Sequence, residues 1–143
     1  MDKDLNIEGV ENMLDTKKTN AVILENDPEL AKTVQKLLEK RGFAVSTLTG
    51  KQEIINEIKR YALAIVGNVQ GSHSVFETMR EIVMNSPMTS IILITDVPEK
   101  EVEDKAEGYG ILGHVNTYVK DSQLNRLIDQ YESIMNPEVK HTS

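Results

Sequence analysis

Short apolar runs alternate along the chain with longer segments whose apolar residues recur at helical spacing. Five of these runs predict strands, over residues 21–24, 43–47, 62–66, 91–94 and 115–119. The first, third and fourth are wholly apolar, which is typical of strands buried on both faces. The second alternates between apolar and polar residues and predicts a more exposed strand.

A helical pattern follows each predicted strand. Asp27 and Pro28 are typical of the N-cap and first position of a helix, and Gly42 predicts its end. The capping-box spacing of residues 49–52 predicts a short helix to about Arg60. The other three helices are expected where apolar residues share one helical face. The third has Val75, Phe76, Met79, Ile82 and Val83 on that face, and the fourth, over 99–107, is polar and weakly packed with only Val102 and Ala106. The fifth is capped by Asp121 or Ser122, and its apolar face has Leu124, Leu127, Ile128, Tyr131 and Met135.

Five strands alternating with five helices predict an α/β domain with a parallel sheet and helices on both faces. The domain is expected to span residues 20–135, followed by a frayed tail over 136–143. Residues 1–19 lie outside the pattern, but their apolar residues fit one side of a short helix: Leu5, Ile7, Val10, Met13 and Leu14. A disordered lead-in and a helix that docks onto this chain or a partner both remain open.

The composition excludes several classes of protein. The chain has 143 residues, which fits one domain, and without cysteine it cannot form a disulfide scaffold or use thiol chemistry. Its formal net charge of −7 argues against a nucleic-acid partner. No apolar run is long enough to span a membrane, and the charged first residues are unlike a secretory signal. A cytoplasmic domain is therefore expected.

Ligands of parallel sheets bind beyond the carboxyl ends of the strands, so the residues that follow each strand are the candidate site. They are Glu25, Asn26 and Asp27 after the first strand, Gly67 and Asn68 after the third, Thr95 and Asp96 after the fourth, and Lys120 after the fifth.

This order of residues resembles the receiver domains of two-component response regulators, through residues 21–30, 91–95 and 113–120. The resemblance implies a flavodoxin-like, doubly wound sheet with strand order 2-1-3-4-5. It also implies a magnesium site at the acidic pair after the first strand and a phosphoacceptor aspartate at the end of the third. Thr95 and Lys120 match the residues that bind the phosphoryl oxygens in that family.

The sequence departs from the family at the positions that carry the chemistry. Gly67, or Asn68 after a one-residue shift, stands at the acceptor position, and neither has a carboxylate. Asn26 replaces the second acid, so Glu25 should bind Mg²⁺ weakly at most, and we expect no metal and no cofactor. Thr117 stands at the position of the switch aromatic, and Tyr118 should face the opposite way.

The interpretation that follows is a degenerate, or pseudo-, receiver that is not an enzyme and acts through protein contacts. By analogy with the family, the fourth helix, fifth strand and fifth helix are the expected surface for a partner or a homodimer. Because a buried ammonium without a partner is costly, Lys120 is expected to pair with Glu25 or Asp27.

Two other functions remain open from the sequence. A displaced carboxylate, Asp96 or Asp27, could accept the phosphoryl group, although both are more simply helix caps. A flavodoxin-like sensor of a small ligand is a further alternative. The G-x-G-x-x-G pattern over 108–113 follows a helix and precedes a strand, the reverse of a dinucleotide site, and predicts a turn. His73, His114 and His141 are scattered and suggest no metal site.

Overall fold

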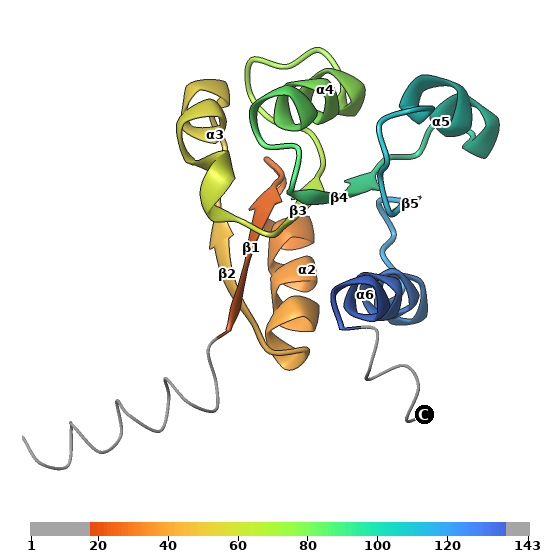
Figure 1. Ribbon diagram of the computed structural model, residues 1–143. Coiled ribbons are helices and arrows are strands. Elements are labelled where there is room, and N and C mark those ends of the chain that lie inside the picture. The colour runs from red at the N-terminus through yellow and green to blue at the C-terminus, as the bar shows by residue number, and fades with distance from the viewer. Residues whose placement is uncertain (1–17, 137–143) are drawn as a thin grey trace, which may run out of the picture.

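The computed structural model describes residues 18–136, which form a parallel sheet with the strand order β2-β1-β3-β4-β5 (Figure 1). The strands are β1 (Thr19–Leu24), β2 (Phe43–Thr47), β3 (Leu63–Val66), β4 (Ser90–Ile94) and β5 (Gly113–Val115). The helices are α2 (Pro28–Lys40), α3 (Lys51–Glu57), α4 (Val75–Asn85), α5 (Glu99–Ala106) and α6 (Asp121–Met135), with a 3-10 turn η1 (Ile58–Arg60). The predicted fold class and strand order are confirmed, whereas the expectations for the two terminal segments fall mainly outside the described residues.

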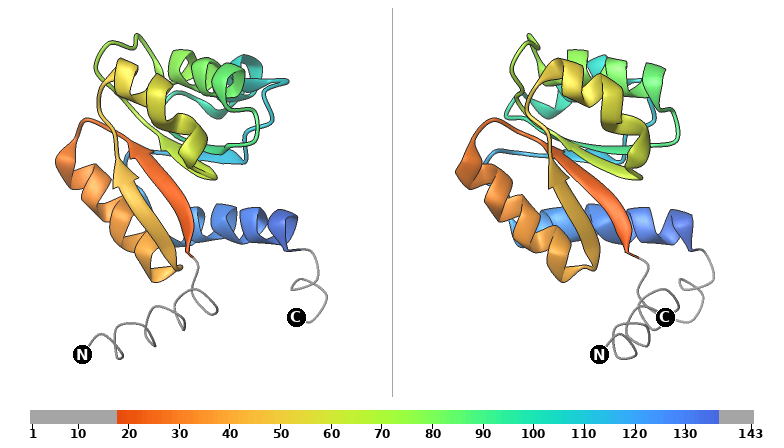
Figure 2. Two further views of the ribbon diagram at one scale, coloured as in Figure 1. Left: turned by 60° about the vertical axis from the view of Figure 1, so that its left-hand side comes forward. Right: turned by 90° about the vertical axis from the view of Figure 1, so that its left-hand side faces the viewer.

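Two helical layers cover the two faces of the sheet (Figure 2). Helices α3, α4 and α5 pack with alternate strand residues such as Val22, Val66 and Leu93 in one core. Helices α2 and α6 pack with the intervening residues, such as Ile23 and Ile65, in the other. The central strands β3 and β4 are therefore buried on both sides, as their unbroken apolar runs predict. No helix within residues 18–136 is both long and apolar enough to cross a membrane.

The local signals at the first helix are confirmed. Asp27 caps α2 by accepting hydrogen bonds from the backbone N–H groups of Glu29 and Leu30. Gly42 follows the helix with a φ of 93°, a conformation that costs glycine less than any other residue. These two residues mark the start and the end of α2.

Three predicted boundaries are wrong. Strand β5 lies over Gly113–Val115 instead of 115–119, because the ladder with β4 ends where Val115 pairs with Ile94. The N-cap of α6 is Lys120, and neither Asp121 nor Ser122 caps it. The N-cap of α3 is Gly50, which makes no side-chain bond.

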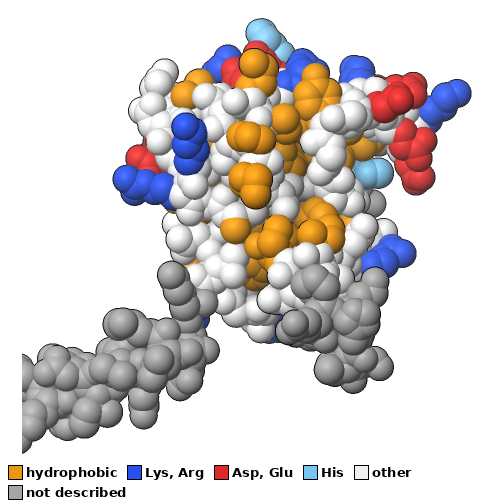
Figure 3. Space-filling model, viewed as in Figure 1, with side chains coloured by type: hydrophobic (Ala, Val, Ile, Leu, Met, Phe, Trp, Pro, Cys, Tyr) orange, Lys and Arg blue, Asp and Glu red, His pale blue; other side chains and the backbone are white. Residues whose placement is uncertain are grey.

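Large apolar side chains remain exposed at the amino edge of the sheet. Met84 and Met88 lie at the end of α4 and in the loop to β4, and Ile134 and Met135 lie at the end of α6. Since the helices run antiparallel to the strands, all four lie toward the amino edge of the sheet. Figure 3 shows hydrophobic side chains gathered between α4 and α6 on one face of the molecule.

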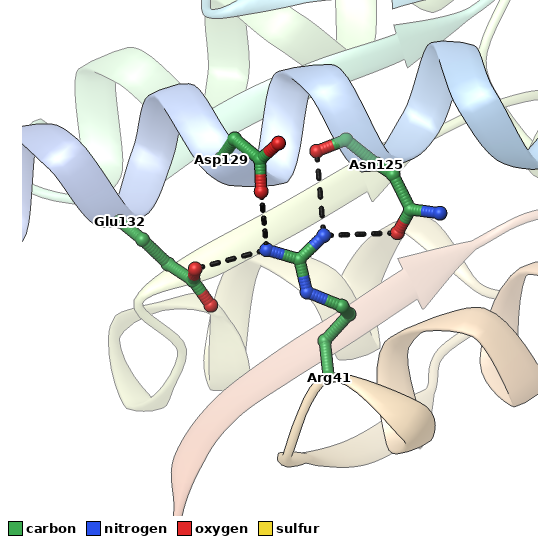
Figure 4. Close-up of polar contacts among 4 residues, drawn as sticks. All are labelled: Arg41, Asn125, Asp129 and Glu132. Carbon is green, nitrogen blue, oxygen red and sulfur yellow. Dashed lines mark hydrogen bonds and ion pairs between the residues drawn. The ribbon is translucent and has the colours of Figure 1, made fainter. Parts of the chain in front are cut away.

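A four-residue polar contact ties α2 to α6 below the sheet (Figure 4). The guanidinium of Arg41 donates to Asp129 at 2.6 Å, to Glu132 at 2.9 Å and to the Asn125 side chain at 2.9 Å. Partial burial of the guanidinium opposes its charge, but the bonds to Asp129 and Glu132 outweigh this and raise the pKa of Arg41. The charged guanidinium of Arg41 therefore stabilises the packing of α2 against α6 through these hydrogen bonds.

Candidate functional site

The loops after β1 and β3 are joined by backbone hydrogen bonds at the carboxyl edge of the sheet. The N–H of Asn26 donates to the carbonyl of Asn68 at 2.8 Å, and the N–H of Gly67 donates to the carbonyl of Leu24 at 2.7 Å. The two strands are neighbours in the sheet, so these bonds continue the ladder past the last strand residues. Residues 25–27 and 67–68 consequently form one rigid unit.

Glu25 turns back into this unit instead of pointing to solvent. It is only 4% exposed, and its two carboxylate oxygens accept from the backbone N–H groups of Asp27 (2.8 Å) and Asn68 (3.1 Å). Hydrogen bonds from N–H groups to a carboxylate are among the stronger ones in proteins. Glu25 therefore acts as a bridge between the β1 and β3 loops.

Gly67 provides the space that the Glu25 carboxylate occupies. A Cβ atom added at Gly67 would collide with Oε1 of Glu25 and would lie 3.1 Å from its Cδ. The backbone of Gly67 does not have a positive φ, so space alone sets glycine apart here. A side chain starting from position 67 and the observed Glu25 carboxylate cannot share this site without a rearrangement.

Thr95 and Asp96 form a second polar cluster, after β4. The buried Thr95 hydroxyl accepts from the N–H of Val97 at 3.3 Å. Asp96 accepts from both the N–H (2.9 Å) and the hydroxyl (2.6 Å) of Thr117. These two bonds lower the pKa of Asp96, the hydroxyl bond having the larger effect. The expectation that Asp96 caps a helix is wrong, since Pro98 is the N-cap of α5 and Asp96 joins the β4 and β5 loops instead.

The prediction that Lys120 forms an ion pair with Glu25 or Asp27 is wrong. Its side chain is exposed, and none of the ion pairs within residues 18–136 joins it to Glu25 or Asp27. The physical reason is that the Glu25 oxygens bind backbone amides and Asp27 caps α2, while water solvates the exposed ammonium. Lys120 and Asp27 do line the same shallow groove of about 430 Å³, together with Tyr118.

The predicted residues thus fall into separate groups. Glu25, Asn26, Asp27, Gly67 and Asn68 lie in one unit, and Thr95, Asp96 and Thr117 lie in another. Tyr118 is 83% exposed and Thr117 only partly so, in line with their expected opposite directions. Across residues 18–136, no three His, Asp or Glu side chains are grouped so that they could hold a metal ion.

The sequence did not predict that the Glu25 carboxylate occupies the space beside Gly67. The sequence shows a glycine and a glutamate 42 positions apart, and either is unremarkable alone. The sequence did contain a signal of this contact. Gly67, at the expected acceptor position, has no side chain, and Glu25, at the first acidic position, has a longer side chain than aspartate would have.

Comparisons with known proteins identify the fold. No protein-family model matches the sequence, and no curated protein is similar to it in sequence. Among solved structures, a CheY-like response regulator receiver domain from Methanospirillum hungatei matches with a TM-score of 0.72 at 16% identity, over 85% of this chain and 99% of that one. The receiver domain of a modulated diguanylate cyclase from Desulfovibrio desulfuricans matches with a TM-score of 0.67 at 22% identity, over 80% and 93%.

A third solved structure is the receiver domain of a sensor histidine kinase from Pseudomonas aeruginosa, with a magnesium ion coordinated in its active site cleft. It matches with a TM-score of 0.65 at 15% identity, over 79% of this chain and 96% of that one. The chain accordingly has the fold of response regulator receiver domains, as its sequence resemblance predicts.

Proposed function

Starting from the receiver fold, we propose that this chain is a pseudo-receiver: a non-catalytic signalling module that works through protein contacts. Its output does not depend on phosphorylation of an aspartate at the end of β3. The observation that carries the proposal is the Glu25 carboxylate lying against Gly67, where a Cβ would collide with it. The place from which an acceptor side chain would project is filled by a group already bonded to two backbone amides.

The same geometry argues against a resident magnesium ion. Mg²⁺ in proteins relies on carboxylate charge and gives up its water reluctantly. The cleft of the Pseudomonas aeruginosa neighbour coordinates this ion, whereas here Asn26 follows Glu25 and both Glu25 oxygens accept backbone hydrogen bonds. A metal ion would have to displace those bonds, with one carboxylate to hold it.

The protein-contact surface proposed for this module is formed by α5, β5 and α6. A groove of about 360 Å³ lies between α5 and β5, and Glu99, Glu103 and Glu107 line it at intervals of one helical turn. Its apolar lining includes Val102, Ala106 and Ile111. This chemistry suits an apolar segment that carries Lys or Arg. Sedimentation at low and high salt would show whether a second copy of the chain, the homodimer alternative, occupies the surface.

Two alternatives have less support in the contacts. Asp96 and Asp27 each have a carboxylate near the carboxyl edge, but Asp96 is bonded through both oxygens to Thr117 and Asp27 caps α2. A flavodoxin-like sensor would need a phosphate-binding loop after β1, where the chain has Glu25, Asn26 and Asp27. A rise in the melting temperature with a flavin nucleotide would favour the sensor.

The decisive experiment is incubation of the full chain with acetyl phosphate and Mg²⁺, followed by intact mass spectrometry. We expect no mass increase, because the chain lacks an acceptor carboxylate at position 67. An adduct of about 80 Da that hydroxylamine removes would contradict the proposal, since it marks an acyl phosphate. Asp96→Asn and Asp27→Asn, tested in parallel, would then identify the displaced acceptor.

A further inference from the structure

The exposed methionines at the amino edge of the sheet form an apolar surface that the described residues leave open. Met84 is 83% exposed and Met88 is 86% exposed, although α4 is otherwise packed on the core through Phe76, Met79 and Ile82. We call Met84 and Met88 the methionine patch. Met84 and Met88 are four residues apart in the chain, and two exposed side chains of this size there favour an interaction surface.

The start of β1 and the loop that carries Met88 lie at the same edge of the sheet. At the amino edge, the N–H of Ala62 donates to the carbonyl of Asn20 (3.0 Å), and the N–H of Ser90 donates to the carbonyl of Ala62 (2.9 Å). Ala21 of β1 is therefore level with Leu63 and Ser90, the first residues of β3 and β4, and Thr19 lies two residues before this level. Only β3 separates β1 from β4, so Ala21 and Ser90 lie about two strand spacings, roughly 10 Å, apart. Met88 precedes Ser90 by two residues.

The chain that precedes β1 is long enough to reach the patch. Leu14 precedes Thr19 by five residues, which span up to about 17 Å when extended. Residues 1–17 lie outside the described part of the chain, but their sequence carries an apolar set at helical spacing: Leu5, Ile7, Val10, Met13 and Leu14.

The charges of the segment and of the patch surroundings are opposite. Residues 1–15 contain five acidic residues and one lysine. Arg80 lies one helical turn before Met84, and Lys59 lies just before β3 at the same edge. Both side chains are exposed, and neither takes part in an ion pair within residues 18–136. Lys and Arg side chains are visible beside the hydrophobic group in Figure 3.

We propose that the apolar side of residues 5–14 packs on the methionine patch of the same chain, between Arg80 and Lys59. The short connection to β1 gives the segment a high effective concentration at the patch, which favours it over a second copy. The proposal does not depend on the absence of phosphorylation at Gly67.

Hydrogen exchange of the full chain tests this contact, with a free peptide of residues 1–17 as the reference. We expect the amides of residues 5–14 to exchange at least about tenfold more slowly in the chain than in the peptide. The double variant Met84→Lys/Met88→Lys should abolish this protection. Tyr118→Lys is the matched control, because Tyr118 is equally exposed but lies in the loop after β5, and it should leave the protection unchanged.

Three results would overturn the proposal. One is exchange of residues 5–14 at the peptide rate in the wild-type chain, and another is protection that survives Met84→Lys/Met88→Lys. The third is protection that rises with protein concentration together with a dimer in sedimentation, which would make a second copy the occupant of the patch.

Discussion

The two halves of the sheet's carboxyl edge are joined in different ways. On the β1–β3 side, the buried Glu25 carboxylate binds backbone amides above a glycine that makes room for it. On the β4–β5 side, the exposed Asp96 carboxylate binds Thr117, one of its two bonds being to a side-chain hydroxyl. The first connection is part of the packed interior, whereas water can replace the second at little cost. The carboxyl edge of the sheet is thus fixed on its β1–β3 side and adjustable on its β4–β5 side.

The largest effect should come from filling the space at Gly67. Gly67→Ala places a Cβ against the Glu25 carboxylate and should lower the free energy of unfolding by about 3 kcal/mol, through overpacking and loss of the amide bonds. Urea denaturation measures the change. Gly50→Ala is the control, because a Cβ there meets nothing within 4 Å, and it should cost only about 1 kcal/mol or less, through the poorer N-cap of α3. Equal effects of the two substitutions would show that space at Gly67 is not special.

Removal of the bridging carboxylate should have a somewhat smaller effect. Glu25→Ala leaves the N–H groups of Asp27 and Asn68 without their acceptor and should cost about 2 kcal/mol of stability. Glu25→Gln retains one carbonyl acceptor and should cost less. Urea denaturation of the wild type, Glu25→Ala and Glu25→Gln measures the order of their stabilities. A Glu25→Ala variant as stable as the wild type would show that the β1–β3 side of the edge is no more firmly joined than the β4–β5 side.

The Asp96–Thr117 contact should have the smallest effect, and one that depends on pH. Because the folded state lowers the pKa of Asp96, its contribution to stability is present above the ordinary aspartate pKa of about 3.9. That contribution is lost as the pH falls through the lower folded-state value. Thr117→Val, which removes the hydroxyl donor, should therefore lower the melting temperature slightly at neutral pH.

The same variant should approach the wild-type melting temperature as the pH falls through the lowered pKa of Asp96. Melting curves at a series of pH values from neutral into acid make the comparison. A difference that is independent of pH would mean that Thr117 contributes through packing, not through the Asp96 charge.

How far the sequence predicts this molecule depends on the range of the interactions. The runs over 62–66 and 91–94 identify β3 and β4, because strands buried on both faces need unbroken apolar residues. Asp27 and Pro28 likewise fix the start of α2, since capping is local. The sequence misplaces β5, where Val115 and Val119 suggest a strand but Asp96 takes the N–H of Thr117 from 21 positions away.

The candidate site divides in the same manner. The residues that follow β1, β3 and β4 were predictable from the strand ends alone, whereas Lys120 lies five residues after the end of β5. How these residues pair was not predictable, because Glu25 meets Gly67 only after β1 and β3 have aligned, and nothing local indicates that Lys120 remains in solvent. Polar contacts between distant loops depend on tertiary geometry, which hydrophobic spacing does not encode.

A double-mutant cycle between Glu25 and Gly67 tests the central claim most directly. The claim is that the carboxylate of Glu25 fills the space which the missing side chain at position 67 leaves. Gly67→Ala should destabilise the wild-type chain by about 3 kcal/mol but the Glu25→Ala chain by about 1 kcal/mol or less, a coupling that only residues in contact show. An equal cost of Gly67→Ala in the two backgrounds would contradict the account.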